Sequence, residues 1–163
     1  MVTLYVMCGV PGSGKTTMSK QMEKEYDLKR FSFDEMQCFR LEEFVRPAID
    51  VLQEGKNVVL DSTNLRINVR KKILQSIADV PCKKVAIYMN TSLNECLQRN
   101  ANREVRLQDF VIESTYRSLQ PPTLDEGWDE IIVINNDGNI ENLENEIKNL
   151  NLLGGDSRNA WIY

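Results

Sequence analysis

The chain has 163 residues and a formal net charge of −4, and this length fits one domain with a single core. Charged residues make up 27% of it, and the negative balance disfavours an extended nucleic-acid surface while leaving room for a short basic channel. Because the chain contains no histidine, Ser-His-Asp triads, Cys-His proteases and histidine-based zinc sites are excluded. Any general base must therefore be a carboxylate, a lysine, a tyrosine or a cysteine.

The apolar runs and the cysteines predict a cytoplasmic protein. The first apolar run stops at Pro11, far short of a membrane span, and no basic segment precedes it as in a signal peptide. The cysteines form no C-x-x-C pair, so we expect reduced and mostly buried thiols at Cys8, Cys38, Cys82 and Cys96.

Apolar strands alternate with amphipathic helices along the first half of the chain. Phe44, Ala48 and Leu52 recur every four residues, as on one face of a helix, and Pro47 is expected near the start of that helix or at a kink. The elements predicted here are a strand at Thr3–Cys8, a helix from about Lys15 to Tyr26, a strand at Leu28–Phe33, a helix that Gly55 closes, and a strand at Asn57–Leu60.

The second half of the chain continues the alternation. Ser92 and Glu95 form a capping box that opens a helix. The elements predicted here are a helix through Ile73, Leu74 and Ile77, a strand at Lys84–Met89, the capped helix, a helix at about Gln108–Leu119, a strand at Glu130–Ile134, a turn at Asn136–Gly138 and a helix at Ile140–Leu150. Five strands, each followed by a helix, predict an α/β fold with a five-stranded parallel sheet and helices on both faces. We place the domain at residues 1–153 and a C-terminal tail at 154–163.

The segment GVPGSGKTT after the first strand matches the P-loop pattern G-x-x-x-x-G-K-[ST] at every fixed position. Glycines let the backbone N–H groups approach phosphates, the lysine neutralises phosphate charge, and the Thr16 hydroxyl can bind Mg²⁺. A flexible glycine turn is the alternative, but the expected strand precedes the segment and the expected helix follows it. The residues expected to contact the nucleotide are Gly9, Pro11, Gly12, Ser13, Gly14, Lys15, Thr16 and Thr17.

Two carboxylates follow strands at the edge where an open parallel sheet binds ligands. Asp61 ends the strand NVVLD and is a candidate partner of Mg²⁺ through water, whereas Asp34 follows FSF and is the candidate general base. Either acid could instead cap the helix that follows it. Glu35, one residue beyond Asp34, is expected to be solvated.

Three arginines follow the fourth strand in the segment RNANREVR. Arg99, Arg103 and Arg106 are four and three residues apart, so they can share one face of a helix. Over a bound triphosphate they would form a lid that stabilises the transferred phosphate. The alternative for such a charged run is a solvated surface. Which arginine would contact the phosphate is left open.

The order of these segments resembles the bacteriophage-type polynucleotide 5′-kinase domain and related small P-loop (AAA-type) kinases. The resemblance rests on GVPGSGKTT, Asp34, VLDSTNLRINVRKKIL, CLQRNANREVR and VIESTYRSLQPPTLDEGWDEIIVI, and it covers the chain from Thr3 to about residue 136. It implies a P-loop kinase fold with an arginine lid that moves the γ-phosphate of ATP to a hydroxyl, often a 5′-OH of DNA or RNA. It also implies that Asp34 activates the hydroxyl and that Arg99 and Arg103 belong to the lid.

The acceptor side of this resemblance departs from the family in one position. These kinases usually carry an arginine three residues after the base, and here that position is Gln37, with Arg40 one turn later. The residues that the resemblance assigns to the acceptor are Asp34, Arg40, Asp61, Thr63 and Asn64.

These features together predict an ATP- and Mg²⁺-dependent kinase whose leading acceptor is a nucleic-acid 5′-hydroxyl. A small-molecule kinase acting on a nucleoside, sugar or nucleotide-sugar is the first alternative. A regulatory module that binds a nucleotide without phosphorylating anything is the second.

Overall fold

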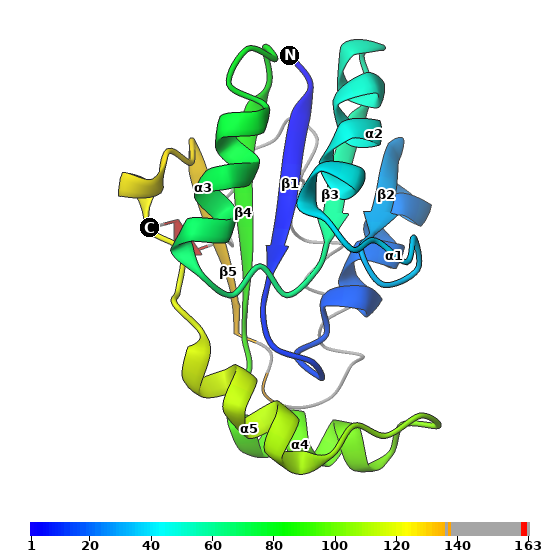
Figure 1. Ribbon diagram of the computed structural model, residues 1–163, viewed down its shortest axis with the longest axis vertical. Helices are drawn as coiled ribbons and strands as arrows, with labels where there is room; N and C mark the ends of the chain where they lie inside the picture. Colours follow the sequence, from blue (N-terminus) through cyan, green and yellow to red (C-terminus); the bar gives the residue numbers. More distant parts are fainter. Residues whose placement is uncertain (136, 138–160, 163) are drawn as a thin grey trace.

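The computed structural model describes residues 1–135, 137 and 161–162, and within these residues one six-stranded sheet forms the centre of the fold (Figure 1). The strands lie in the order β2-β3-β1-β4-β5-β6. Their bounds are β1 Thr3–Cys8, β2 Leu28–Ser32, β3 Asn57–Asp61, β4 Lys83–Asn90, β5 Glu130–Asn135 and β6 Trp161–Ile162. The first five are parallel, as predicted, with boundaries that differ from the prediction by one residue at most. The antiparallel strand β6 on β5 was not predicted.

Helices cover both faces of the sheet and one of its ends. The helices are α1 Lys15–Glu25, α2 Leu41–Gln53, α3 Ile67–Ser76, α4 Leu93–Ala101 and α5 Asp109–Ser118. Side chains alternate along β1, so Tyr5 and Met7 pack with α1, whereas Leu4 and Val6 pack with α2 and α3. Figure 1 shows α4 and α5 across the end of the sheet to which the strand arrows point, rather than on a face. The carboxyl ends of the strands therefore lie between α4 and the body of the domain.

The second helix contains Pro47 in its interior instead of near its start. Its predicted apolar face is confirmed, since Phe44, Ala48 and Leu52 are all buried. Helix α2 begins at Leu41, where the Glu43 carboxylate accepts a hydrogen bond from the backbone N–H of Phe39.

A buried ion pair joins α3 to the short helix η1 (Leu124–Glu126). Arg70 is fully buried, and its Nε and Nη2 donate to the two oxygens of Glu126 at 2.8 and 2.7 Å. The indole N–H of Trp128 also donates to this carboxylate at 2.9 Å. Burial alone would raise the pKa of Glu126, but the hydrogen bonds from Arg70 and Trp128 outweigh it and hold the pKa below its ordinary value.

Some predictions lie outside the described residues. These are the helix at Ile140–Leu150, the turn residues Asn136 and Gly138, and the boundary between residues 153 and 154. The four cysteines are free thiols, and Cys8, Cys82 and Cys96 are buried as expected. In the described part of the chain, no helix is long and apolar enough to cross a bilayer.

Breaking the Arg70–Glu126 pair should destabilise the fold strongly. Glu126→Gln leaves the buried Arg70 charge uncompensated, so we expect the free energy of unfolding to fall by about 3–5 kcal/mol. The double variant Arg70→Met with Glu126→Leu removes both charges and should recover part of this loss. Urea unfolding measures both values, and a Glu126→Gln loss below about 1 kcal/mol would contradict the role given to the pair.

The difference in unfolding free energy between the wild type and Glu126→Gln should depend on pH. Because the pKa of Glu126 is lowered in the folded state, its contribution is present above its unfolded pKa of about 4.3 and is lost as the pH falls through the folded pKa. The stability gap between the wild type and Glu126→Gln should therefore shrink in acid.

Candidate functional site

The P-loop forms the turn between β1 and α1, at the carboxyl end of the central strand. Gly12 and Gly14 adopt φ angles of 84° and 96°, which favour glycine. A Cβ on Gly12 would also lie 2.8 Å from the carbonyl oxygen of Cys96, because α4 packs directly against the loop. The remaining P-loop residues lie where the sequence predicted them: Gly9 and Pro11 before the turn, Ser13 within it, and Thr16 and Thr17 in the first turn of α1.

Lys15 is a buried cation inside this loop. Its side chain is 9% exposed, and Nζ donates to the carbonyl of Val10 at 3.1 Å. Burial lowers the pKa of Lys15, while the nearby carboxylates of Asp61 and Asp34 oppose that shift. Both predicted carboxylates therefore act electrostatically on Lys15. The sequence alone predicted only that these carboxylates and the P-loop share one edge of the sheet.

Asp61 is held in a buried hydrogen-bonded cluster. Its Oδ2 accepts from the Ser19 hydroxyl and from Nη2 of Arg30, each at 2.7 Å. The same guanidinium donates to Glu35 at 2.6 Å. Glu35 is exposed to solvent, as expected, and its ion pair with Arg30 was not predicted. Arg30 thus connects the end of β3 to the turn that carries Asp34.

Asp34 lies in an exposed turn that follows β2. The turn is closed by backbone hydrogen bonds from Gln37 to Asp34 at 3.1 Å and from Cys38 to Phe33 at 3.2 Å. Gln37 takes a φ of 54°, which is unusual outside glycine. The carboxylate of Asp34 is therefore presented to solvent at the sheet edge, as a general base that meets an external acceptor must be.

Thr63 and Asn64 hold the P-loop in place. The backbone carbonyl of Thr63 accepts from the Gly9 N–H at 2.9 Å. Asn64 is buried with a φ of 44°, and its side-chain amide donates to the carbonyl of Met7 at 2.7 Å. The Asn64 amide thus stabilises the fold by bonding the end of β1, while Thr63 is partly exposed at the edge of the sheet.

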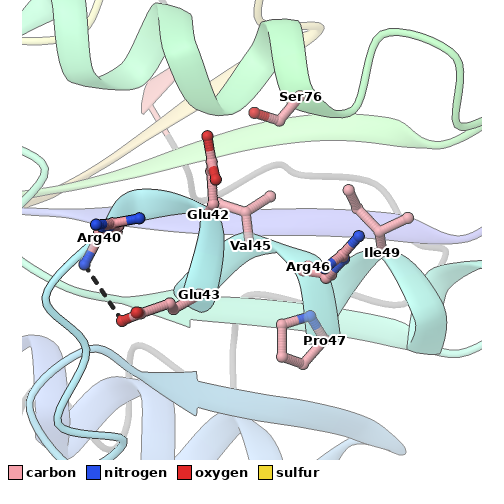
Figure 2. A pocket seen from close by; sticks show the side chains of 8 residues that line it. All are labelled: Arg40, Glu42, Glu43, Val45, Arg46, Pro47, Ile49 and Ser76. Atoms are coloured by element: carbon pink, nitrogen blue, oxygen red, sulfur yellow. Dashed lines mark hydrogen bonds between the residues drawn. The ribbon is translucent and has the colours of Figure 1, made fainter.

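A hollow of ≈ 220 Å³ opens beside this edge, between the start of α2 and the loop before α3. Its lining combines the aromatic pair Phe33 and Phe44 with Thr63, Asn64 and Arg66. Two further hollows, of ≈ 470 and ≈ 710 Å³, lie between α2 and α3. Both contain Arg40, which Figure 2 shows at the start of α2 with its backbone N–H bonded to Glu43. Arg40 does not line the ≈ 220 Å³ hollow itself but directly precedes Leu41, which does.

The arginine segment reaches the P-loop from the opposite side. Arg99 donates from Nη1 to the carbonyl of Gly12 at 3.1 Å, and the positive charge of Arg103 contributes to lowering the pKa of Lys15. The prediction that Arg99, Arg103 and Arg106 share a helix face is wrong, because α4 ends at Ala101. Arg106 instead lies in the following loop and pairs with Asp109 at 3.1 Å.

Asn100 closes this loop on itself. Its side chain is fully buried and makes two hydrogen bonds with the backbone of Leu107, donating to the carbonyl at 2.7 Å and accepting from the N–H at 3.0 Å. The six residues between them carry Arg103 and Arg106. A buried amide with both of its functions used fixes the ends of the arginine loop.

The donor chemistry at the edge fits Mg²⁺ held mainly through Thr16. Within residues 1–135, the exposed Thr16 hydroxyl makes no hydrogen bond, whereas Oδ2 of Asp61 already accepts from two donors, one of them cationic. Direct ligation by Asp61 is therefore disfavoured, and contact through water suits it better. In the same part of the chain, no three Cys, Asp or Glu side chains are grouped to hold a metal by themselves.

Comparison with protein families identifies the fold independently. Residues 35–122 match the family model AAA_33, described as an AAA domain, and this match covers more than half of the chain, so the chain belongs to that family. Among solved structures, a fungal RNA kinase superposes with a TM-score of 0.72 at 19% identity, over 93% of this chain and 44% of that protein. Sugar kinases are also among the chains with this fold, so the fold alone does not identify the acceptor.

Two curated relatives support the resemblance noted in the sequence. The L-seryl-tRNA(Sec) kinase of Methanococcus maripaludis is 27% identical over 143 residues, which is 77% of this chain and 56% of that protein. The bifunctional polynucleotide phosphatase/kinase of Schizosaccharomyces pombe is 24% identical over 133 residues, 78% of this chain and 32% of that protein. The resemblance to polynucleotide kinases and their small P-loop relatives is confirmed. The chain spans about half or less of the length of these relatives.

The Asn100 clasp can be tested by limited proteolysis. Asn100→Ala leaves two backbone groups of Leu107 without partners, so the loop should open about 10-fold more often and trypsin should cut faster after Arg103 and Arg106. Asn102→Ala, at the exposed C-cap of the same helix, is the matched control and should leave cleavage unchanged. Equal cleavage rates in the wild type and Asn100→Ala would show that the two hydrogen bonds do not hold the loop.

Proposed function

We propose that this member of the AAA domain family is an ATP-dependent kinase that transfers the γ-phosphate to a hydroxyl, with a 5′-OH of DNA or RNA as acceptor. The observation that carries the proposal is that the P-loop with the buried Lys15 and the turn with the exposed Asp34 both follow the carboxyl ends of parallel strands, β1 and β2, in one sheet. A phosphate cradle and a carboxylate open to solvent thus share one edge.

The nucleotide side consists of the P-loop and the arginine segment. The amides of the loop and the Lys15 ammonium surround the space for the β- and γ-phosphates, and the first turn of α1 points its positive end there. Arg99 and Arg103 approach from the α4 side and stabilise charge on the transferred group. Mg²⁺, bound through the Thr16 hydroxyl and linked to Asp61, would neutralise charge on the phosphate oxygens.

The acceptor side supplies the base. Asp34 accepts the hydroxyl proton while the acceptor oxygen forms a bond to the γ-phosphorus and the bond from that phosphorus to the bridging β,γ-oxygen breaks. The products are the phosphorylated acceptor and ADP, with the proton on Asp34. Arg30 has a positioning role, because it pairs both with Glu35, the neighbour of this base in the chain, and with Asp61 at the end of β3.

A nucleic-acid acceptor is supported by the relatives and by the residues around the ≈ 220 Å³ hollow. The names of both curated relatives mention a substrate that contains nucleic acid, a seryl-tRNA in one and a polynucleotide in the other. Arg66 lines the hollow, and Arg40 precedes Leu41, another residue of its lining; both could supply positive charge that the chain lacks at Gln37, where the resemblance expects an arginine. Thr63 at the hollow and the edge acid Asp61 complete the proposed acceptor surroundings.

A small-molecule kinase is the second candidate, favoured by the small size of the hollow and by the sugar kinases that share the fold. A cytoplasmic location and a domain that ends at residue 153 remain predictions.

Asp34→Asn should reduce turnover by orders of magnitude and leave ATP affinity nearly unchanged, because the amide cannot accept the hydroxyl proton. Transfer from labelled ATP to 5′-OH DNA, 5′-OH RNA and a panel of nucleosides and sugars measures turnover and identifies the acceptor. Asp79→Asn, an exposed acid before β4, is the control. Unchanged turnover in Asp34→Asn would remove this residue from the mechanism.

Salt should weaken the binding of a nucleic-acid acceptor. Two phosphate contacts to a single strand give a slope of about −1.4 for log affinity against log salt concentration, and Arg66→Ala or Arg40→Ala should each reduce it by about 0.7. A salt-independent affinity for the oligonucleotide would favour the small-molecule candidate.

A further inference from the structure

Phe39 is the feature that the proposed kinase reaction leaves unexplained. Its side chain is 92% exposed, more than any other large apolar residue in the described chain except Met1. Isolated exposed apolar residues are common on protein surfaces and need no explanation by themselves. Phe39 differs from such residues in two ways. Hydrogen bonds hold its backbone in place, and it lies only five residues after Asp34, in the segment that follows the same turn.

The backbone of Phe39 is held although its ring is in solvent. Its N–H donates to Oε2 of Glu43 at 2.9 Å, and the same oxygen accepts from the N–H of Arg40 at 3.3 Å (Figure 2 shows the bond to Arg40). The preceding residue, Cys38, donates to the carbonyl of Phe33 at 3.2 Å. An aromatic ring on a fixed backbone loses little conformational entropy when a flat ligand packs on it.

The closure of the turn brings Phe39 to the acceptor side. Phe33 and Cys38 are hydrogen-bonded to each other, Asp34 follows the first of them, and Phe39 follows the second. The ring and the proposed base are therefore each one residue from the same closing bond. Leu41, two residues after Phe39, already lines the ≈ 220 Å³ hollow.

The charged residues next to Phe39 carry both signs. Arg40 is its exposed neighbour and lines the same groove as Glu42, while one carboxylate oxygen of Glu43 is occupied by two backbone N–H groups. A base on the ring with its phosphate toward Arg40 satisfies this arrangement. Aromatic stacking combined with nearby arginine is the usual way in which proteins bind single-stranded nucleic acid.

We infer that Phe39 is a stacking platform for a nucleobase of the acceptor strand, and that it contributes to acceptor specificity without taking part in the chemistry. The inference rests on the proposed function, since the base that stacks belongs to the strand whose 5′-OH meets Asp34. Phe39 lies outside the P-loop, the edge acids and the arginine segment. The inference gives this exposed residue a role in recognising single-stranded nucleic acid.

The experiment compares Phe39→Ala with the wild type on a short single-stranded 5′-OH oligonucleotide. Loss of one stacked base raises the KM for the oligonucleotide about 5- to 150-fold, with little change in the KM for ATP. Phe110→Ala, which removes another exposed phenylalanine on α5, is the matched control and should leave both values unchanged. Phe39→Trp should retain the wild-type KM.

Abasic acceptors separate stacking from a structural effect. Oligonucleotides that lack the base at the first, second or third nucleotide are each phosphorylated by the wild type and by Phe39→Ala. At the position whose base stacks on Phe39, the wild type should lose affinity and the penalty of Phe39→Ala should vanish. A penalty that persists at all three positions, or no penalty on the intact strand, overturns the inference while leaving the kinase proposal in place.

A binding measurement distinguishes the stacking inference from the kinase proposal if no oligonucleotide is phosphorylated. In that case the proposed acceptor class fails, and the fluorescence of the Phe39→Trp variant is titrated with the same oligonucleotide against a wild-type background. Quenching that the abasic strand does not produce supports stacking, and the absence of quenching overturns it.

Discussion

The Arg70–Glu126 pair is the interaction on which the position of the P-loop depends. Arg70 uses two of its nitrogens on Glu126 and a third, Nη1, on the carbonyl of Asn64 at 2.8 Å. This contact holds the left-handed backbone of Asn64, whose side-chain amide in turn grips the end of β1. The carbonyl of Thr63, the residue before Asn64, accepts a hydrogen bond from the N–H of Gly9, the first residue of the loop. A buried charge pair between α3 and η1 is thus connected to the phosphate cradle through the hydrogen bonds of Asn64 and Thr63.

A second buried arginine sets the electrostatics of the same edge. Arg30 places one positive charge between Asp61 and Glu35, and its Nε also donates to the Ser19 hydroxyl at 2.7 Å. One acid of the edge is thereby neutralised within the protein. Among the described residues, the partly desolvated Lys15 donates to a backbone carbonyl, that of Val10, and not to a carboxylate in any hydrogen bond of the cradle. A polyphosphate would supply an anion there, so the site is preorganised for a highly charged ligand.

The sequence predicts the parallel strands and the P-loop well because both depend on local patterns. The buried polar partners are harder to predict. Alternation along β2 places Arg30 on the buried side with Leu28, and helical spacing places Arg70 on the face of Ile73, but neither pattern identifies the acid across the fold. Such a residue signals that a partner exists, because an unpaired buried arginine is too costly to be retained.

The errors also have a physical cause. The arginines after β4 are spaced as on a helix, yet the chain leaves the helix after Ala101 because the amide of Asn100 binds the backbone of Leu107. A side chain that competes for backbone groups is invisible to periodicity. Strand β6 was missed for a different reason, since its two residues, Trp161 and Ile162, are too few to show an alternating pattern.

The two sides of the edge are built from different kinds of groups. The proposed nucleotide side includes groups held inside the fold, such as the buried Lys15 and the Gly12 carbonyl that accepts from Arg99, beside the exposed Thr16 hydroxyl. The proposed acceptor side includes three exposed side chains on one short segment, Asp34, Phe39 and Arg40. On the proposed function, substitutions of these exposed side chains would change acceptor recognition at little cost in stability. Kinases with different acceptors can therefore share this sheet and cradle, and acceptor choice in this chain should be sought in residues 33–41.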